Sequence, residues 1–348
     1  MSTHDVYMQR CLQLAKKGIG SARPNPSVGA VIVYQDTIIG EGFTSPYGGS
    51  HAEVNAIASV REKDLLKQAT LYVTLEPCSH YGKTPPCADL IVKTGIPKVV
   101  IGCMDTNSLV SGKGILRLRE AGCLVTVGVL EDACKAHHKR FFTVQEKKRP
   151  YIILKWAESR DGFIAPLVKE EQKPVWISNI YSRQLAHKWR AKEQAILIGT
   201  NTAIDDQPQL NVRDWSGHDP IRVVIDQHLR IPKDNPIYSG KVKTLILTAQ
   251  EKVSESPFLS FETIKFSKSL PLEICNRLQK HNIQSVLIEG GSQTLQSFID
   301  NNLWDEAFVF TGEPLFKEGV LAPRFNGQLT MEEVVGNDRL QLYTNTDT

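Results

Sequence analysis

The chain has 348 residues, a length that favours two domains over one. Its hydrophobic content of 41% is that of an ordinary globular protein, and its formal net charge of +3 is too small to indicate a nucleic-acid partner. Because the N-terminus lacks a secretion-signal pattern and no apolar run could span a bilayer, we expect a cytoplasmic protein with no membrane partner.

The first part of the chain alternates helical and strand patterns, which predicts an α/β layered domain. Asp5 is a residue type that caps helices, and Gly18 and Gly20 are typical of helix ends, so a first helix is expected to run to about Lys17. We predict strands over 28–34, 37–43, 71–75, 98–103 and 124–127, and helices over 51–60, 87–94 and 115–121.

Potential metal ligands lie where these predicted elements begin or end. His51 and Glu53 open one helix, Cys78 follows a strand as part of a Pro-Cys pair, and Cys87 opens another helix. His-x-Glu with a later Pro-Cys is the signature of zinc nucleobase deaminases, in which one imidazole and two thiolates leave a zinc position open for water. Zinc lowers the pKa of that water to about 7, and a carboxylate in the position of Glu53 moves its proton.

The spacing of the two cysteines differs from the common form of this signature. Eight residues separate Cys78 from Cys87, where the common form has two. The loop 79–86 must therefore fold back so that both sulfur atoms reach one metal. Helix N-termini carry partial positive charge, which favours thiolates at such positions.

The other cysteines follow no repeating spacing and lie in apolar contexts. We expect them to be buried free thiols rather than disulfides, as suits a reducing compartment. They are Cys11, Cys103, Cys123, Cys134 and Cys275.

A densely charged segment follows, from Glu131 to Pro150. We interpret it as a solvated linker rather than a basic patch that follows phosphates, because no interleaved aromatic residues extend it. It divides the chain into a predicted first domain over 1–146 and a second over 151–346.

The second domain again alternates strands and helices, which predicts another α/β fold. Strands are expected over 151–156, 195–198, 222–226, 244–248, 285–288, 308–311 and 340–343, and helices over 178–190 and 292–301. Two of these strands run into similar loops, 199–202 and 289–292, in which glycine and small hydroxyl residues precede a helix. Such loops expose backbone N–H groups to an anion, which favours a phosphate-bearing cofactor. The sequence has no Gly-x-Gly-x-x-Gly, which disfavours a standard Rossmann site.

Together these residues resemble the bifunctional deaminase/reductase family of bacterial riboflavin biosynthesis. The resemblance covers nearly the whole chain, and it includes the eight-residue cysteine spacing. It is carried by residues 23–31, 51–53, 74–87, 155–162, 176–178, 199–202, 206–210, 213 and 289–291.

The resemblance implies a fold and two activities. The fold is a cytidine-deaminase-like three-layer domain followed by a dihydrofolate-reductase-like α/β domain. The first domain would use zinc to remove the 2-amino group of 2,5-diamino-6-(5-phosphoribosylamino)pyrimidin-4-one. The second would use NADPH to reduce the ribosyl chain of 5-amino-6-(5-phosphoribosylamino)uracil to ribityl. The substrate is thus a phosphorylated pyrimidine ribosylamine rather than a nucleic acid, and the chain is expected to form a homo-oligomer, a dimer or a tetramer.

The same resemblance assigns residues in the deaminase half. It implies that His51, Cys78 and Cys87 bind zinc and that Glu53 is the catalytic proton shuttle. Asn25, Lys83 and Asn107 would contact substrate, with Lys83 as a point charge for the phosphate. For Asn25 a plain turn residue in a Pro-Asn-Pro run is the alternative.

In the reductase half the resemblance implies a cofactor site and a substrate site. Arg190 could instead be a helix-surface cation and Trp176 a core aromatic. Either Asp206 or Glu289 could orient or protonate the sugar oxygen. The implied substrate contacts are Arg190, Leu210, Arg213 and Glu289, and the implied NADPH contacts are Ala157, Trp176, Thr202, Asp206, Gly291, Ser292, Gln293, Thr294 and Leu295.

The chain departs from the family pattern at three places. Thr44 stands where a histidine is frequent, Thr106 replaces a proline, and Pro174 replaces a polar residue. Two rival functions fit the sequence less well. A nucleic-acid deaminase would need a basic, aromatic-studded surface, and a binding protein with an inactive reductase half would not need the intact motifs of that half.

Overall fold

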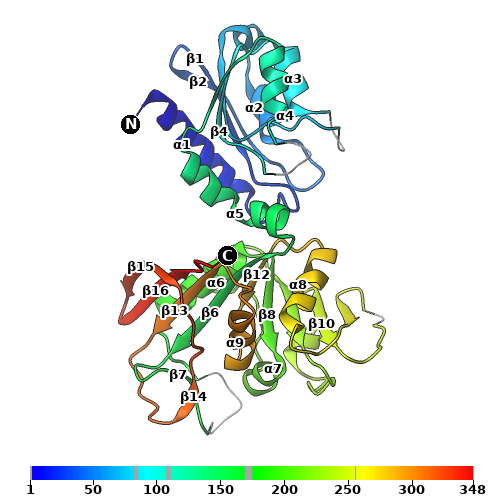
Figure 1. Cartoon of the computed structure of the whole chain (residues 1–348), viewed down its shortest axis with the longest axis vertical. Helices are drawn as coiled ribbons and strands as arrows, with labels where there is room; N and C mark the ends of the chain where they lie inside the picture. The colour runs from blue at the N-terminus through cyan, green and yellow to red at the C-terminus, as the bar shows by residue number, and fades with distance from the viewer. Residues whose placement is uncertain (1, 82–84, 107–110, 169–174, 255, 348) are drawn as a thin grey trace. The chain divides into compact units, whose positions relative to one another are not determined.

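The computed structural model describes residues 2–81, 85–106, 111–168, 175–254 and 256–347. The chain divides into two compact units, Met1–Lys148 and Arg149–Thr348, which we call unit 1 and unit 2 (Figure 1). Among the described residues, no helix combines the length and the apolar character needed to cross a membrane.

Unit 1 is built on a five-stranded sheet with the order β2-β1-β3-β4-β5. β1 and β2 form an antiparallel hairpin whose turn residues, Gln35 and Asp36, have positive φ values of 46° and 59°. β3, β4 and β5 are parallel, so their carboxyl ends meet at one edge. The five predicted strands are confirmed as β1 Gly29–Tyr34, β2 Thr37–Phe43, β3 Thr70–Leu75, β4 Lys98–Cys103 and β5 Leu124–Val127.

Helices cover both faces of this sheet, and the side chains of its central strands are therefore buried on both sides. α1 and α5 lie on one face, and α2, α3 and α4 lie on the other (Figure 1). The N-cap of α1 is Ser2 rather than the predicted Asp5, whose carboxylate instead accepts the Ser2 N–H and completes a capping box. The helical elements are α1 Thr3–Ala15, η1 Lys16–Gly18, α2 Ala52–Ser59, η2 Lys63–Gln68, α3 Cys87–Thr94, α4 Lys113–Glu120 and α5 Glu131–Lys147.

The prediction of a solvated linker over 131–150 is wrong, because most of this segment is the helix α5. Cys134, His138 and Phe142 recur every four residues and are buried, so α5 has a face that packs on the sheet. The His138 ring nitrogen Nε2 lies 3.2 Å from the Thr74 hydroxyl. A Cβ atom on Gly102 of β4 would lie 2.3 Å from Cys134 Sγ, which shows how closely α5 approaches the sheet.

Unit 2 is built on a nine-stranded sheet with the order β11-β10-β9-β8-β12-β6-β13-β16-β15. From β11 to β13 all neighbouring strands are parallel, and β16 and β15 are antiparallel additions at one edge. β11, β15 and the separate pair β7–β14 were not predicted. The strands are β6 Tyr151–Glu158, β7 Phe163–Pro166, β8 Ala195–Gly199, β9 Ile221–Ile225, β10 Thr244–Thr248, β11 Leu259–Thr263, β12 Ser285–Ile288, β13 Glu306–Thr311, β14 Gly319–Leu321, β15 Gln328–Val335 and β16 Asp338–Thr344.

Alternate residues of the central strands point to two different cores. Ile152 and Leu154 of β6 belong to the core under α8 and α9, whereas Tyr151 and Ile153 pack with Trp189 of α6. All five cysteines expected to be buried free thiols are so. The helical elements of unit 2 are α6 Ile180–Lys192, α7 Thr200–Asp206, η3 Pro236–Tyr238, α8 Leu270–Lys280 and α9 Ser292–Asp300.

The packing of α5 predicts unequal effects for two substitutions on that helix. Phe142→Ala removes a buried ring and should lower the free energy of unfolding of unit 1 by about 3 kcal/mol. Glu146→Ala, on the exposed face, should change it by less than about 0.5 kcal/mol. Urea unfolding followed by far-UV circular dichroism measures both.

The two units can be followed separately in that experiment. All five tryptophans of the chain lie beyond residue 150, so tryptophan fluorescence reports unit 2 alone. Equal, small effects of both substitutions would show that α5 is not packed on unit 1 in solution.

Candidate functional site

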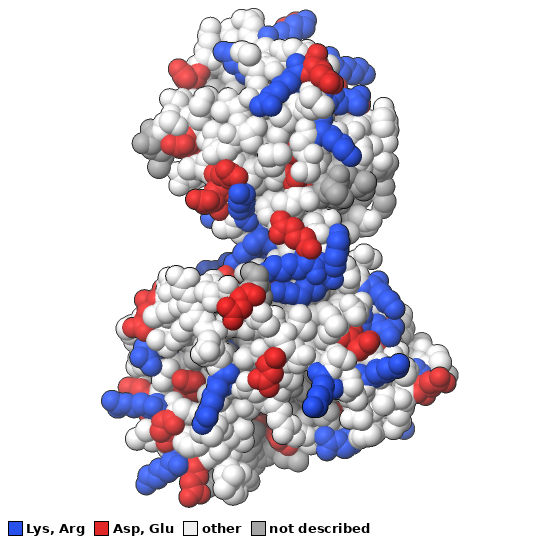
Figure 2. Space-filling model, viewed as in Figure 1, with Lys and Arg blue, Asp and Glu red and all other residues white. Residues whose placement is uncertain are grey.

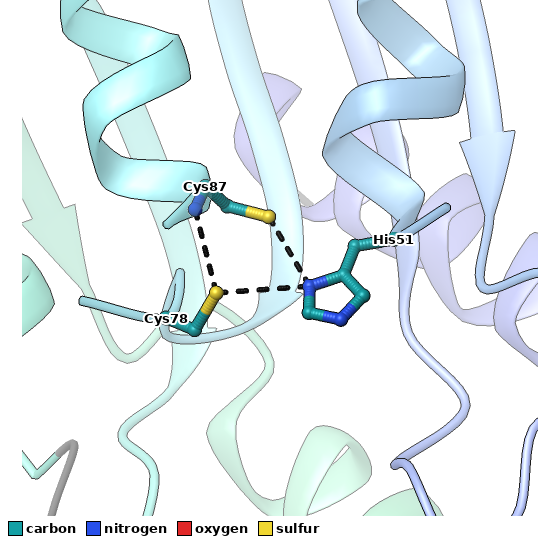
Figure 3. A group of neighbouring side chains, drawn as sticks. All are labelled: His51, Cys78 and Cys87. Carbon is teal, nitrogen blue, oxygen red and sulfur yellow. Dashed lines mark hydrogen bonds between the residues drawn. The ribbon is translucent and has the colours of Figure 1, made fainter. Parts of the chain in front are cut away.

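Three potential metal ligands converge in unit 1 (Figure 3). His51 is the N-cap residue of α2, Cys87 is the first residue of α3, and Cys78 follows β3. His51 Nδ1 lies 3.3 Å from Cys87 Sγ and 3.6 Å from Cys78 Sγ. The predicted fold-back of the loop between the cysteines is confirmed at its ends, because the Cys87 N–H donates to Cys78 Sγ at 3.3 Å.

The separations of these donor atoms fit a zinc ion. Zinc bonds of about 2.1 Å to nitrogen and 2.3 Å to sulfur, at tetrahedral angles, place the two donors roughly 3.6 Å apart. Hydrogen bonds from Cys87 and His51 lower the pKa of the Cys78 thiol well below its usual range, which favours a thiolate ligand at this position. One imidazole and two sulfurs leave one tetrahedral position for water.

Glu53 lies in the first turn of α2, beside these ligands, with only 4% of its surface exposed. Burial raises the pKa of its carboxyl group to about 7, and the neighbouring Cys78 adds to the rise. A carboxyl group with a pKa near neutrality can both accept and release a proton, as a general acid–base catalyst must.

Glu76 fixes the turn that carries Cys78. Its buried carboxylate accepts four backbone N–H groups at 2.9–3.3 Å, from Asp105, Gly112, Gly114 and Ile115. These donors include the start of α4, where N–H groups have no partner within the helix. The sequence motif contained Glu76, but its role could not be read from the motif, since its partners lie 29 or more residues away.

His51, Cys78 and Glu53 line a cavity of about 340 Å³ in unit 1. Asn25 lines it, as a substrate contact would. Phe141 and Gln145 of α5 also line it, and sequence reasoning missed both because it took α5 for a linker. The Thr44 hydroxyl at the cavity wall accepts the Val28 N–H at 2.9 Å. Two expected substrate contacts, Lys83 and Asn107, lie outside the described residues.

In unit 2 the two predicted glycine loops lie side by side, because they follow the neighbouring parallel strands β8 and β12. A Cβ atom on Gly290 would lie 2.9 Å from Thr202 Cγ2, and one on Gly199 would lie 2.7 Å from Thr294 Oγ1. Gly291 has a positive φ of 72° at the N-cap of α9. The arrangement brings Thr202, Gly291 and Thr294 together at two helix starts, where a phosphate-bearing cofactor could bind.

Arg190 and Glu289 form a bidentate ion pair next to the loops, at 2.8 Å and 2.6 Å. Their side chains are only 13% and 7% exposed, so Arg190 is not a helix-surface cation. Burial alone would raise the pKa of Glu289, but the Arg190 guanidinium and the nearby Lys155 lower it to about 2. Glu289 is therefore a carboxylate at neutral pH.

Arg213 lies close to this pair through Asn211. The Asn211 carbonyl accepts from Arg190 Nη1 at 3.3 Å, and its side-chain oxygen accepts from Arg213 Nη1 at 3.1 Å. The Arg213 N–H donates to His187 Nδ1 at 3.3 Å. Burial, with the two arginines, lowers the pKa of His187 to about 4, so this ring is neutral and can accept that bond. Sequence reasoning missed His187, although it lies one helical turn before Arg190.

The other predicted contacts of unit 2 divide by exposure. Trp176 is 53% exposed, with the Arg183 guanidinium 4.3 Å from its ring centroid, so it is not a core aromatic. The side chains of Leu210 and Leu295 lie in hydrophobic cores, which leaves only their backbone groups for a ligand. Ala157 lies on β6, and Asp206 is the last residue of α7. Ser292 Oγ donates to the Leu321 carbonyl at 2.8 Å, and Gln293 is exposed. Pro174 lies outside the described residues.

Comparison with protein families matches each unit to a different family model. The model of the "Cytidine and deoxycytidylate deaminase zinc-binding region" matches residues 1–103. The model of the "RibD C-terminal domain" matches residues 150–331.

Relatives match over nearly the whole chain. The riboflavin biosynthesis protein RibD of Aquifex aeolicus is 39% identical, over 90% of this chain and 88% of its own. The RibD of Escherichia coli is 35% identical, over 89% of this chain and 88% of its own. A crystal structure of a diaminohydroxyphosphoribosylaminopyrimidine deaminase/5-amino-6-(5-phosphoribosylamino)uracil reductase from Thermotoga maritima has a TM-score of 0.89 and 36% identity, with 98% of each chain covered.

The convergence of three ligands predicts that each is needed to hold zinc. Purified protein should contain about one zinc per chain, and Cys87→Ser should lose it, because a serine hydroxyl stays protonated at neutral pH and binds zinc poorly. Elemental analysis by mass spectrometry measures the metal. Cys123→Ser, at another buried thiol, is the matched control and should keep zinc. Unchanged zinc in Cys87→Ser would remove this residue from the coordination sphere.

Proposed function

The chain belongs to the RibD family of bifunctional riboflavin-biosynthesis enzymes, and from this premise we propose the substrates of its two units and the roles of their residues. It is an enzyme with a zinc-dependent deaminase domain and an NADPH-dependent reductase domain. The deaminase would act on 2,5-diamino-6-(5-phosphoribosylamino)pyrimidin-4-one. The reductase would act on 5-amino-6-(5-phosphoribosylamino)uracil, the substrate in the name of the Thermotoga maritima enzyme.

The observation that carries the first half of this proposal is a buried carboxyl group beside three converging metal ligands in one cavity. Zinc held by His51, Cys78 and Cys87 supplies the Lewis acidity that lets water attack the amine-bearing ring carbon at neutral pH. Glu53 accepts the proton of the attacking water, passes it to the ring nitrogen, and delivers a proton to the departing amine. Asn25 orients the pyrimidine from the cavity wall, and Lys83 and Asn107 stay predictions.

In the reductase half, the neighbouring glycine loops and the ion pair support a cofactor site beside a substrate site. NADPH supplies the hydride that reduces the ribosyl chain. The loop and helix residues would bind the cofactor, and Arg190, Arg213 and the Leu210 backbone would bind the substrate. Since Arg190 keeps Glu289 ionised, Glu289 would orient the sugar through its carboxylate rather than donate a proton, and the role of Asp206 stays a prediction.

The surface supports a small-molecule substrate. Figure 2 shows Lys and Arg side chains among Asp and Glu on the visible face of each unit, a mixture that differs from a continuous basic stripe.

The homo-oligomer, a dimer or a tetramer, and the cytoplasmic location stay predictions. For the oligomer we note that β15 is an edge strand with exposed Leu329, Met331 and Val334. Light scattering of the purified chain would decide its state.

The proton-shuttle role predicts a variant that keeps zinc but loses turnover. Glu53→Gln preserves the side-chain shape and all three ligands, yet an amide cannot carry the proton. Deamination should fall by at least about a hundredfold. Zinc content and NADPH-dependent reduction of already deaminated substrate should remain normal. Deamination at a near-normal rate in this variant would show that Glu53 is not the shuttle.

The two-site reading predicts that the reductase works without zinc. Zinc-stripped protein given deaminated substrate should still oxidise NADPH, measured by absorbance.

Arg213→Ala should raise the substrate KM by about tenfold with little change in the KM for NADPH, because it removes a charge-assisted phosphate contact. Lys188→Ala, a change to another cation of the same unit, should leave both KM values unchanged. A rise confined to the KM for NADPH would move Arg213 to the cofactor site.

A further inference from the structure

Unit 2 contains a second cavity, of about 230 Å³, at the edge of the sheet opposite the glycine loops. The glycine loops follow the carboxyl ends of β8 and β12. This cavity is instead lined by residues that precede β9 and β10, namely Asp219 and Lys241, and by Arg222 at the start of β9. Because these strands are parallel, their starts and ends lie at opposite edges.

Arg222 in this cavity is a buried cation with weak compensation. Only 4% of its surface is exposed, and its Nε has no hydrogen-bond partner among the described residues. Its Nη1 makes two long hydrogen bonds, to the Pro236 carbonyl at 3.3 Å and to Ser239 Oγ at 3.4 Å. Asp219 is the anionic side chain that attracts it, from beyond ion-pair distance, and a buried guanidinium with no anion in direct contact is unfavourable, so this site is suited to receive one.

The other lining groups add donors around the same space. Lys241 and Ser239 are exposed at its rim, and the amide side chains of Gln209 and Asn211 also line it. Asp219 lines it too and attracts Arg222 through space, but among the described residues it makes no ion pair with that guanidinium, and its Oδ1 accepts the Val212 N–H at 2.7 Å. This carboxylate could accept a hydrogen bond from a hydroxyl group of a bound ligand.

We propose that this cavity binds a phosphate group, either as the free ion or as part of a small phosphate ester. The planar fork of Arg222 matches two phosphate oxygens, and Lys241 supplies a second positive charge. The hydroxyl of Ser239 and the amides of Asn211 and Gln209 can donate to the remaining oxygens. The cavity is large enough for phosphate with a small sugar.

This phosphate site is separate from the proposed reductase substrate site but shares Asn211 with it. Asn211 lines the cavity, while its backbone oxygen accepts from Arg190 and its side-chain oxygen accepts from Arg213. A test must therefore distinguish phosphate bound by Arg222 from phosphate bound by Arg213.

The experiment titrates inorganic phosphate into the full chain, loaded with zinc and saturated with NADPH, by isothermal calorimetry. Arg222→Met and Lys241→Glu should each weaken phosphate binding by at least about tenfold. Lys241 is exposed, so its variant folds normally even where Arg222→Met does not. Lys233→Glu makes the same charge change outside the cavity and should alter the affinity less than about twofold.

Two results would overturn the proposal. One is equal phosphate affinity in the wild type and in folded Arg222→Met and Lys241→Glu. The other is loss of all binding in Arg213→Ala, which would place the phosphate in the substrate site. Ribose 5-phosphate identifies the source: Arg222-dependent binding tighter than that of inorganic phosphate supports an ester, and weaker or equal binding supports the free ion.

Discussion

The deaminase unit depends on a geometric requirement: three side chains from separate parts of the chain must bring their donor atoms within 4.8 Å of one another. Two of them, His51 and Cys87, sit where helices begin, and Cys78 follows a buried strand. Helix starts are fixed in position but have free N–H groups, which stabilise negative charge. The Glu76 carboxylate binds such groups at the start of α4 and thereby ties the Cys78 turn to that helix. A Cβ atom on Gly114 would lie 2.1 Å from the Pro77 carbonyl, so only glycine permits this close approach.

The reductase unit holds buried charges in pairs of oppositely charged side chains. Arg190 and Glu289 neutralise each other, and the pairing keeps Glu289 ionised although burial raises the pKa of its carboxyl group. Arg149 and Asp305 form a second buried bidentate pair, which also accepts the Ile152 N–H at the start of the central sheet. A buried pair of this kind contributes little net stability but fixes the position of both groups. At the candidate substrate site, fixed position is what orientation of a sugar requires.

Sequence patterns predicted the strands and motifs that are defined by residues close together in the chain. The central strands are runs of buried apolar residues, and the metal ligands follow a fixed motif, so both could be read directly. The helix α5 could not be predicted in this way, because its many charged residues obscured the recurrence of Cys134, His138 and Phe142 at every fourth position. β15 escaped prediction because nearly all its side chains are exposed and no alternation marks a buried face. The bonds of Glu76 and His187 join distant segments, and no local pattern records such partners.

The extent of the deaminase unit follows from these long-range contacts. The zinc-binding family model ends at residue 103, and the residues before that point include all three ligands and Glu53. Yet the N–H groups that hold Glu76 come from residues 105–115, and Phe141 and Gln145 of α5 complete the cavity wall. His137 of the same helix bonds the Ser27 carbonyl at 2.8 Å, next to the loop that carries Asn25. The zinc motif therefore contains the candidate ligands, whereas the segment after it holds their turn in place and lines the cavity beside them, and we propose that a functional deaminase unit extends to the end of α5.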